Sequence, residues 1–169
     1  MNTLTAVMEW IEENPKEGVR FLESLADELR ILLDVASRPL IPLQTELDLC
    51  RAHLRVMSCR KAAQFDLQTD GTLVHGQIPP AIFHTLLENA ISHNSYDDER
   101  VAFRLKEERA AGRRRYTFSA PLRQRERSGR NGVGMRYVTT RLEESYPGRW
   151  TLDTFADADA WHTAIEVPA

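Results

Sequence analysis

The chain has 169 residues, of which 42% are hydrophobic and 28% charged, and its formal net charge is −3. This length suits one domain, or one domain with a helical extension, and the composition is typical of a globular protein with a full core. The negative net charge argues against a general nucleic-acid binder, because such proteins neutralise phosphates with a basic excess.

The two cysteines, Cys50 and Cys59, form no CxxC motif and are too few for a disulfide framework, so we expect a reducing compartment. No apolar stretch reaches the length of a membrane span, and the acidic first residues lack the basic start of a signal peptide. We therefore expect a cytoplasmic chain, which could still be the soluble end of a longer, membrane-anchored protein.

The first third of the chain has the apolar spacing of helices. A first helical segment runs from Leu4 to Ile11. Asn14 and Pro15 then predict a capped helix start, with Glu17 where a capping box places its acid. One face of this second helix carries apolar residues at helical spacing: Val19, Leu22, Leu25, Ala26, Leu29, Leu32 and Leu33.

A third helix follows the break at Ser37-Arg38-Pro39. Its apolar residues alternate steps of three and four, which is a heptad seam: Leu40, Leu43, Leu47, Cys50, Leu54 and Met57. Such a seam packs either against a helix of a second chain or within the core of its own chain, and the pattern leaves both alternatives open.

After about residue 62 the pattern changes to the alternation of strands. We expect strands around residues 65–67, 101–105, 116–120, 150–154 and 161–167, with the charged stretch 107–115 as a hairpin loop and 157–159 as a turn. Helices are expected after Pro79-Pro80 and over Met135–Tyr146. The plan is a helical front of about 60 residues and an α/β body of about 100.

The helix after Pro79-Pro80 carries the polar pair Glu88 and Asn89 in the otherwise apolar stretch HTLLENAISHN. A buried carboxylate costs several kcal/mol unless it is paired or used. Asn89 offers a hard oxygen suited to Mg²⁺, Glu88 could orient a water or accept a proton, and His93 lies one turn beyond Asn89. The alternative is that both side chains face solvent from the edge of an amphipathic helix.

A second motif, SGRNGVGMR at residues 128–136, places Gly132 and Gly134 just before a predicted helix. Glycines at a helix N-terminus let a phosphate approach backbone N–H groups. The same glycines are also common in plain turns. The loop before them is basic, which suits either phosphates or a solvated charged surface: Arg123, Arg125, Arg127 and Arg130.

These motifs, in this order, resemble sensor histidine kinases of the autolysin-sensor type, in the portion that joins dimerisation helices to the ATPase. LLENAISHN resembles the N-box of the ATPases shared by gyrase, heat-shock chaperones, histidine kinases and mismatch-repair proteins. Further segments resemble the family's other motifs: LADELRILL (25–33), Pro42–Arg60, Ile78-Pro79-Pro80, Gly132–Met135 with Arg141-Leu142, and His162-Thr163.

The resemblance implies an α+β fold, with N-terminal helices followed by a two-layer α/β sandwich of the Bergerat ATPase type, whose mixed sheet has helices on one face. It implies a helical dimerisation and linker region at 1–61 and an ATP-binding domain at 62–169. The chain would form a homodimer, bind no nucleic acid and signal to a response regulator. ATP and Mg²⁺ would be its cofactors.

The resemblance also assigns roles to residues. Glu88 would be the catalytic acid and Asn89 the Mg²⁺ ligand. His93 would lie near the phosphates, and Thr163 near the adenine floor. Gly132 and Gly134 would form the hinge of the lid under the triphosphate.

Three departures from the family's pattern accompany these roles. Asn2-Thr3-Leu4 resembles the tail of the family's His-x-x-Phe-Asn segment, which places the phosphoacceptor histidine upstream of Met1. Ala120-Pro121 replaces the adenine-reading Asp-x-Gly-x-Gly, and Tyr137 stands where Asn is usual. The alternative function is therefore a catalytically degenerate binding or regulatory module with weak or no ATP binding.

Overall fold

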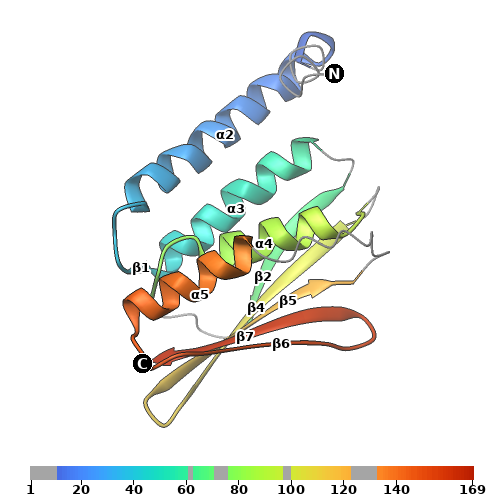
Figure 1. The fold of residues 1–169 in the computed structure, drawn as a ribbon. Helices are drawn as coiled ribbons and strands as arrows, with labels where there is room; N and C mark the ends of the chain where they lie inside the picture. The colour runs from blue at the N-terminus through green and yellow to red at the C-terminus, as the bar shows by residue number, and fades with distance from the viewer. Residues whose placement is uncertain (1–10, 61–62, 71–75, 97–99, 123–132) are drawn as a thin grey trace.

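The computed structural model describes residues 11–60, 63–70, 76–96, 100–122 and 133–169 (Figure 1). No helix within these ranges is both long and apolar enough to cross a membrane. The principal helices are α2 (Pro15–Val35), α3 (Leu43–Arg60), α4 (Ile82–His93) and α5 (Val133–Ser145). The strands are β1 (Ile41–Pro42), β2 (Gln64–Asp70), β3 (Gln77–Ile78), β4 (Arg100–Ala110), β5 (Arg113–Pro121), β6 (Thr151–Ala156) and β7 (Ala160–Pro168).

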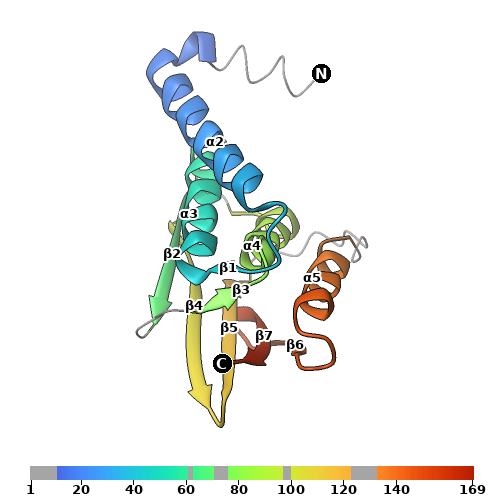
Figure 2. The ribbon, with the colours of Figure 1, turned by 90° about the vertical axis from the view of Figure 1, so that its left-hand side faces the viewer.

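Five strands form one mixed sheet in the order β2-β4-β5-β7-β6, in which β2 and β4 are parallel and the other neighbours antiparallel. Helices α3, α4 and α5 cover one face of this sheet (Figures 1 and 2). The α+β class and the two-layer sandwich with helices on one face are thereby confirmed. The core lies between the layers, where alternate strand residues such as Phe103, Phe118 and Ile165 meet apolar helix residues.

Helix α3 contributes its heptad seam to this core. Leu43, Leu47, Cys50 and Leu54 are all buried and belong to the same apolar cluster as the sheet residues. The seam therefore packs within its own chain, and the intermolecular alternative is wrong. The helix also begins at Leu43 instead of Leu40, because Ile41 and Pro42 form strand β1, which pairs with β3.

The start of α4 is capped by α3. Ala81, at the N-cap position of α4, has a positive φ of 59° and supplies no side-chain cap. The fully buried carboxylate of Glu46 accepts hydrogen bonds from the backbone N–H groups of Ala81, Phe83 and His84, at 2.7, 2.7 and 3.1 Å. An anion at a helix N-terminus satisfies donors that have no intrahelical acceptor. The helical front is thus joined directly to the helix of the candidate site.

The predicted hairpin loop at residues 107–115 is much shorter in the structure. Strand β4 continues to Ala110 and β5 begins at Arg113, so only Ala111 and Gly112 form the turn, with φ values of 50° and 74°. Two central residues with positive φ fit the right-handed twist of a hairpin. The charged residues of these strand segments are exposed or half-buried, and some form ion pairs, such as Lys106–Glu108 and Arg115–Glu166.

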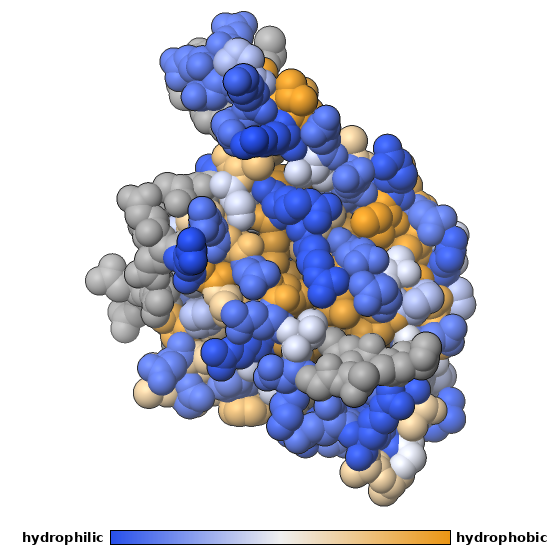
Figure 3. Space-filling view, turned by 180° about the vertical axis from the view of Figure 1, so that it is seen from behind, coloured by the Kyte–Doolittle hydropathy of each residue, from blue (hydrophilic) through white to orange (hydrophobic). Residues whose placement is uncertain are grey.

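Helix α2 lies against α3 and projects from the rest of the molecule (Figures 1 and 3). It begins at Pro15 as predicted, but Asn14 makes no side-chain capping hydrogen bond, and Glu17 pairs with Arg20 at 2.6 Å. Its buried residues are Gly18, Phe21, Glu28 and Val35. Its apolar face is mostly exposed, with relative exposures of 50% for Leu22 and 51% for Leu29.

Candidate functional site

The polar pair on α4 lies where the helix meets its surface. Eight residues of α4 are buried, Glu88 is exposed and Asn89 is half-buried. The interpretation of Glu88 as a carboxylate inside a buried helix is therefore wrong, because a side chain at that position points outward. Its position is instead that of an accessible acid beside a half-buried carboxamide.

Asn89 lies against the first turn of α5. A Cβ placed on Gly134 would lie 2.7 Å from both Nδ2 and Oδ1 of Asn89. Any other residue at position 134 would displace the carboxamide from this place, so two of the predicted cofactor-binding residues are in contact. The contact also brings the helix N-terminus of α5 next to the predicted metal ligand, which is a favourable environment for an anionic group.

Thr163 is fully buried in β7, opposite Phe118 of β5 and Thr154 of β6. Its Oγ1 has no hydrogen-bond partner among the described residues. A buried hydroxyl without a partner costs free energy, and such a group in a native structure calls for a ligand or an ordered water. This fits the predicted position of Thr163 at the floor of a nucleotide site.

The end of β5 lies beside Thr163. Ala120 is buried and pairs with Trp161 of β7. The next residue, Pro121, accepts a hydrogen bond of 2.8 Å from the hydroxyl of Tyr96 through its carbonyl oxygen. The side chain at position 120, where the resemblance leads us to expect a carboxylate, is a buried methyl group.

Glu88 and His93 line an open depression of about 500 Å³ together with His53, Met57 and Arg60 of α3. Asn89, Gly134 and Thr163 do not line this depression. Two of the predicted site residues thus line the depression, and the other three described ones do not. Gly132 and the arginines at 123, 125, 127 and 130 lie outside the described residues.

Two contacts that sequence analysis missed hold α4 in place. One is the Glu46 cap, and the other is the hydroxyl of Tyr137, which donates to the carbonyl oxygen of Pro80 at 3.0 Å. Burial raises the pKa of Tyr137, so the hydroxyl keeps its proton and remains a donor at neutral pH. The departure from Asn at this position therefore has a structural role. Neither contact has a local sequence signal, since the partners are far apart along the chain.

A third missed feature is a buried group formed by Glu28, His53 and His84. Its signal in the sequence is Glu28 itself, which lies seven residues from both Phe21 and Val35 in a buried stripe of α2. A charge in such a stripe requires partners.

The predicted site residues offer an exposed acid, a carboxamide against a helix N-terminus and, in β7, a buried hydroxyl with no partner among the described residues. Carboxamide oxygens suit Mg²⁺, and backbone N–H groups at a helix start suit phosphates. An arrangement of this kind can bind a nucleotide and neutralise its charge. The chemistry available to Glu88 is proton acceptance or the orientation of a nucleophile.

Comparisons with known proteins show which sequences and folds the chain is similar to. Residues 1–65 match the model of the histidine kinase family, described as "Histidine kinase". The sensor protein LytS of Oceanobacillus iheyensis is 30% identical over 94 residues, which are 54% of this chain and 16% of that protein. The chain therefore spans about a sixth of the length of this curated relative.

Solved structures share the fold. A bacterial phosphotransferase aligns with a TM-score of 0.59 and 12% identity, covering 95% of this chain and 85% of that one. The catalytic domain of histidine kinase ThkA aligns with a TM-score of 0.55 and 13% identity, covering 76% of this chain and 93% of that one. At these identities the likeness concerns the fold alone.

Proposed function

The chain resembles the dimerisation and ATPase portion of sensor histidine kinases of the autolysin-sensor type, and from this premise we propose that it binds ATP with Mg²⁺ between α4 and α5. The histidine kinase match over residues 1–65 and the fold of the body support a sensor kinase module. The observation that carries the proposal is the contact between Asn89 and Gly134. It places Asn89, whose carboxamide suits Mg²⁺, beside the N-terminus of α5, where the triphosphate would lie.

Each residue of the site would have a defined task. Asn89 would hold Mg²⁺ through its carboxamide oxygen, and Gly132 and Gly134 would let the phosphates approach the backbone at the start of α5. Thr163 would direct its unpartnered hydroxyl toward the adenine. ATP supplies the phosphoryl group for transfer, which such sites promote by positioning and charge neutralisation.

Glu88 and His93 would serve the transfer from the depression shared with α3. Glu88 is exposed in the depression shared with α3, so a phosphoacceptor histidine could reach its carboxylate there. Glu88 would then accept a proton or orient the imidazole, and His93 would lie near the transferred phosphate. The acceptor would be a histidine upstream of this chain, and the phosphoryl group would pass from there to a response regulator.

The proposal includes a homodimer of the chain, formed through α2. Val19, Leu22, Ala26, Leu29 and Leu33 are exposed on α2 and follow steps of three and four. Among the residues that the structure describes, this seam is exposed, and an exposed heptad seam suits the same seam of a second copy. The dimerisation surface would thus lie on α2, whereas the seam of α3 is used within the chain.

The alternative function is a degenerate module that regulates by docking, with weak or no ATP binding. The buried Ala120 favours it, because a methyl group cannot hydrogen-bond the adenine amino group. A hydrogen bond to a charged partner contributes about 1.5–3 kcal/mol, so its absence lowers affinity roughly ten- to a hundredfold. Asn89, Gly134 and Thr163 are unaffected by this replacement and favour binding.

Calorimetric titration of the 169-residue chain with a nonhydrolysable ATP analogue, with and without Mg²⁺, distinguishes the two functions. We expect saturable binding that requires Mg²⁺. Asn89→Ala should abolish the Mg²⁺ dependence because it removes the metal ligand. Gly134→Ala should do the same, because the added methyl group would displace the Asn89 carboxamide.

Thr140→Ala is the matched control, since Thr140 is exposed on α5 away from Asn89. It should bind the analogue as the unaltered chain does. The absence of heat at millimolar analogue would reject ATP binding and favour the degenerate module. Binding that Asn89→Ala leaves unchanged would reject the site between α4 and α5.

A further inference from the structure

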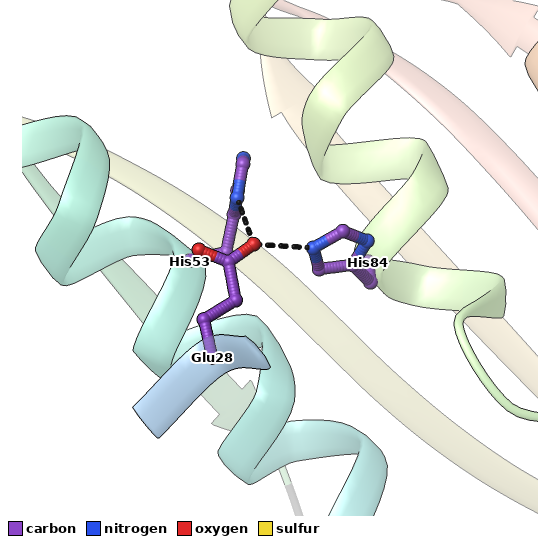
Figure 4. A group of neighbouring side chains, drawn as sticks. All are labelled: Glu28, His53 and His84. Atoms are coloured by element: carbon purple, nitrogen blue, oxygen red, sulfur yellow. Dashed lines mark hydrogen bonds and ion pairs between the residues drawn. The ribbon is translucent and has the colours of Figure 1, made fainter. Parts of the chain in front are cut away.

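Three titratable side chains from three different helices meet in the interior, next to the candidate nucleotide site but separate from it. Figure 4 shows Glu28 of α2 between His53 of α3 and His84 of α4. Glu28 Oε1 lies 2.9 Å from His53 Nδ1 and 3.0 Å from His84 Nε2. The two imidazole rings meet edge to face with centroids 4.7 Å apart.

All three side chains are buried, with at most 9% of each exposed. Burial alone would raise the pKa of Glu28, but the hydrogen bonds from His53 and His84 outweigh it and lower the pKa to about 2. The carboxylate is therefore an anion at neutral pH. Two imidazoles and one carboxylate in a water-poor space form a donor set with a net negative charge whenever both imidazoles are neutral.

The position of Glu28 in the sequence makes this convergence unusual. Phe21, Glu28 and Val35 are buried at heptad spacing on the side of α2 that faces α3. Leucine or valine at the central position would pack there without the cost of burying a charge. A carboxylate at this position, met by a histidine from each of two other helices, indicates a site that binds a cation.

We propose that Glu28, His53 and His84 bind one divalent transition-metal ion, for which Zn²⁺ is the best-matched candidate. Two histidines and one glutamate, with a fourth position left to water, form a known zinc donor set. Zn–N and Zn–O bonds of about 2.0–2.2 Å in a tetrahedron place ligand atoms about 3.3 Å apart. The two N···O distances are already within a few tenths of an ångström of that value, and all three ligand atoms lie within 4.8 Å of one another.

The site also has a path for the ion and for its water ligand. His53 lines the open depression beside Glu88 and His93, so one face of the donor set borders solvent. An ion can enter from that side and keep one water molecule there. A buried metal site needs such access as much as it needs its ligands.

The ion would fasten the projecting helix α2 to the body. Glu28 is on α2, His53 on α3 and His84 on α4, five residues before Asn89. A metal bound by all three resists separation of α2 from the start of α4. The site does not depend on ATP, so it can exist whether or not the proposed nucleotide site does.

Chelator-treated chain titrated with Zn²⁺ alone tests the proposal, with binding followed by competition against a chromogenic chelator. We expect one Zn²⁺ per chain and a higher melting temperature on binding, because the ion binds the folded state only. His53→Gln, His84→Gln and Glu28→Gln should each weaken Zn²⁺ at least about tenfold. Circular dichroism checks that each variant is folded.

His162→Gln is the matched control. His162 also lies close to a carboxylate, 3.0 Å from Asp157, but on β7 and apart from the cluster. It should leave Zn²⁺ affinity unchanged. X-ray absorption at the zinc edge of the unaltered chain provides a readout that needs no variant, and it should show two imidazole ligands.

Either of two results would overturn the proposal. One is the absence of saturable binding of Zn²⁺ or Co²⁺ by the unaltered chain. The other is a bound ion without two imidazole ligands, or one that Glu28→Gln and His53→Gln do not affect. The group would then be a hydrogen-bonded tie between helices that holds no metal.

Discussion

At the scale of single residues, the proposed nucleotide site depends on the contact between Asn89 and Gly134. A carboxamide occupies the space that any other residue at position 134 would fill with a Cβ. This contact holds Asn89 at the edge of α4 while Glu88 points outward. The two neighbours can therefore act on different partners, with Asn89 toward the start of α5 and Glu88 toward the depression beside α3.

Ala120→Asp tests the adenine side of the site. A carboxylate at the end of β5 would supply the hydrogen bond that the buried methyl group lacks, so we expect adenine nucleotide affinity to rise roughly ten- to a hundredfold. The same change should lower stability without ligand, because it buries a charge. Calorimetric titration measures the first effect and urea unfolding the second.

Ala120→Ser is the companion variant, since it adds a small hydrogen-bonding group without a charge. It should bind nucleotide more weakly than Ala120→Asp and unfold at a higher urea concentration. Equal nucleotide affinity in the unaltered chain and a folded Ala120→Asp variant would show that Ala120 does not face the adenine.

At the scale of elements, contacts from α3 and α5 hold α4 in position. Its first N–H groups are capped by Glu46 of α3, and Pro80 just before it is bonded by Tyr137 of α5. Because α3 also buries its leucines in the core, it acts as part of the body and not as a free linker. A movement of α3 would therefore also shift α4, because the Glu46 carboxylate is hydrogen-bonded to the first turn of α4.

Helix α2 leads to a prediction about assembly. Leu22 and Leu29 are half-exposed on its apolar seam, whereas Leu47 of α3 is buried. The double change Leu22→Glu and Leu29→Glu should convert dimers into monomers in sedimentation without unfolding the chain, because it places charges between paired seams. Leu47→Glu should instead destabilise each chain, since it buries a carboxylate in the core. Dimers that persist in the first variant would place the interface elsewhere.

The elements with strong periodicity could be predicted from the sequence. Alternation in Tyr116, Phe118 and Ala120 marked β5, and the spacing of Met135, Val138 and Leu142 marked α5. The β4–β5 hairpin was predicted with too long a loop, because charge was taken as a sign of a loop. These exposed or half-buried charged residues instead continue the two paired strands. The heptad pattern of α3 could not reveal its partner, since an apolar seam is the same whether it meets another chain or its own sheet.

The candidate site was less predictable than the fold. Sequence patterns named Asn89, Gly134 and Thr163, but not the contact of Asn89 with Gly134 or the unpartnered Thr163 hydroxyl. These depend on how α4, α5 and β7 pack. Helical periodicity placed Glu88 in an apolar helix and could not show that its position faces solvent. The roles of these residues and of Glu88 remain predictions.

At the scale of the whole molecule, several polar contacts join the front and the body. Among them, Glu46 caps α4, Glu28 meets His53 and His84, and Arg141 of α5 donates to the carbonyl oxygen of Arg38 at 2.9 Å. The proposed function requires such connections, because in a sensor module a change at the helices must alter the geometry at the nucleotide site. The division into a region at 1–61 and a domain at 62–169 remains a prediction about function.

The most direct test is a crystal structure of the chain grown with Mg²⁺ and a nonhydrolysable ATP analogue. The account predicts that the carboxamide oxygen of Asn89 coordinates the metal, that the phosphates lie at the start of α5 and that the adenine approaches Thr163. A structure in which the analogue binds elsewhere, while Asn89 and Glu88 both face bulk water with nothing against α4, would contradict it.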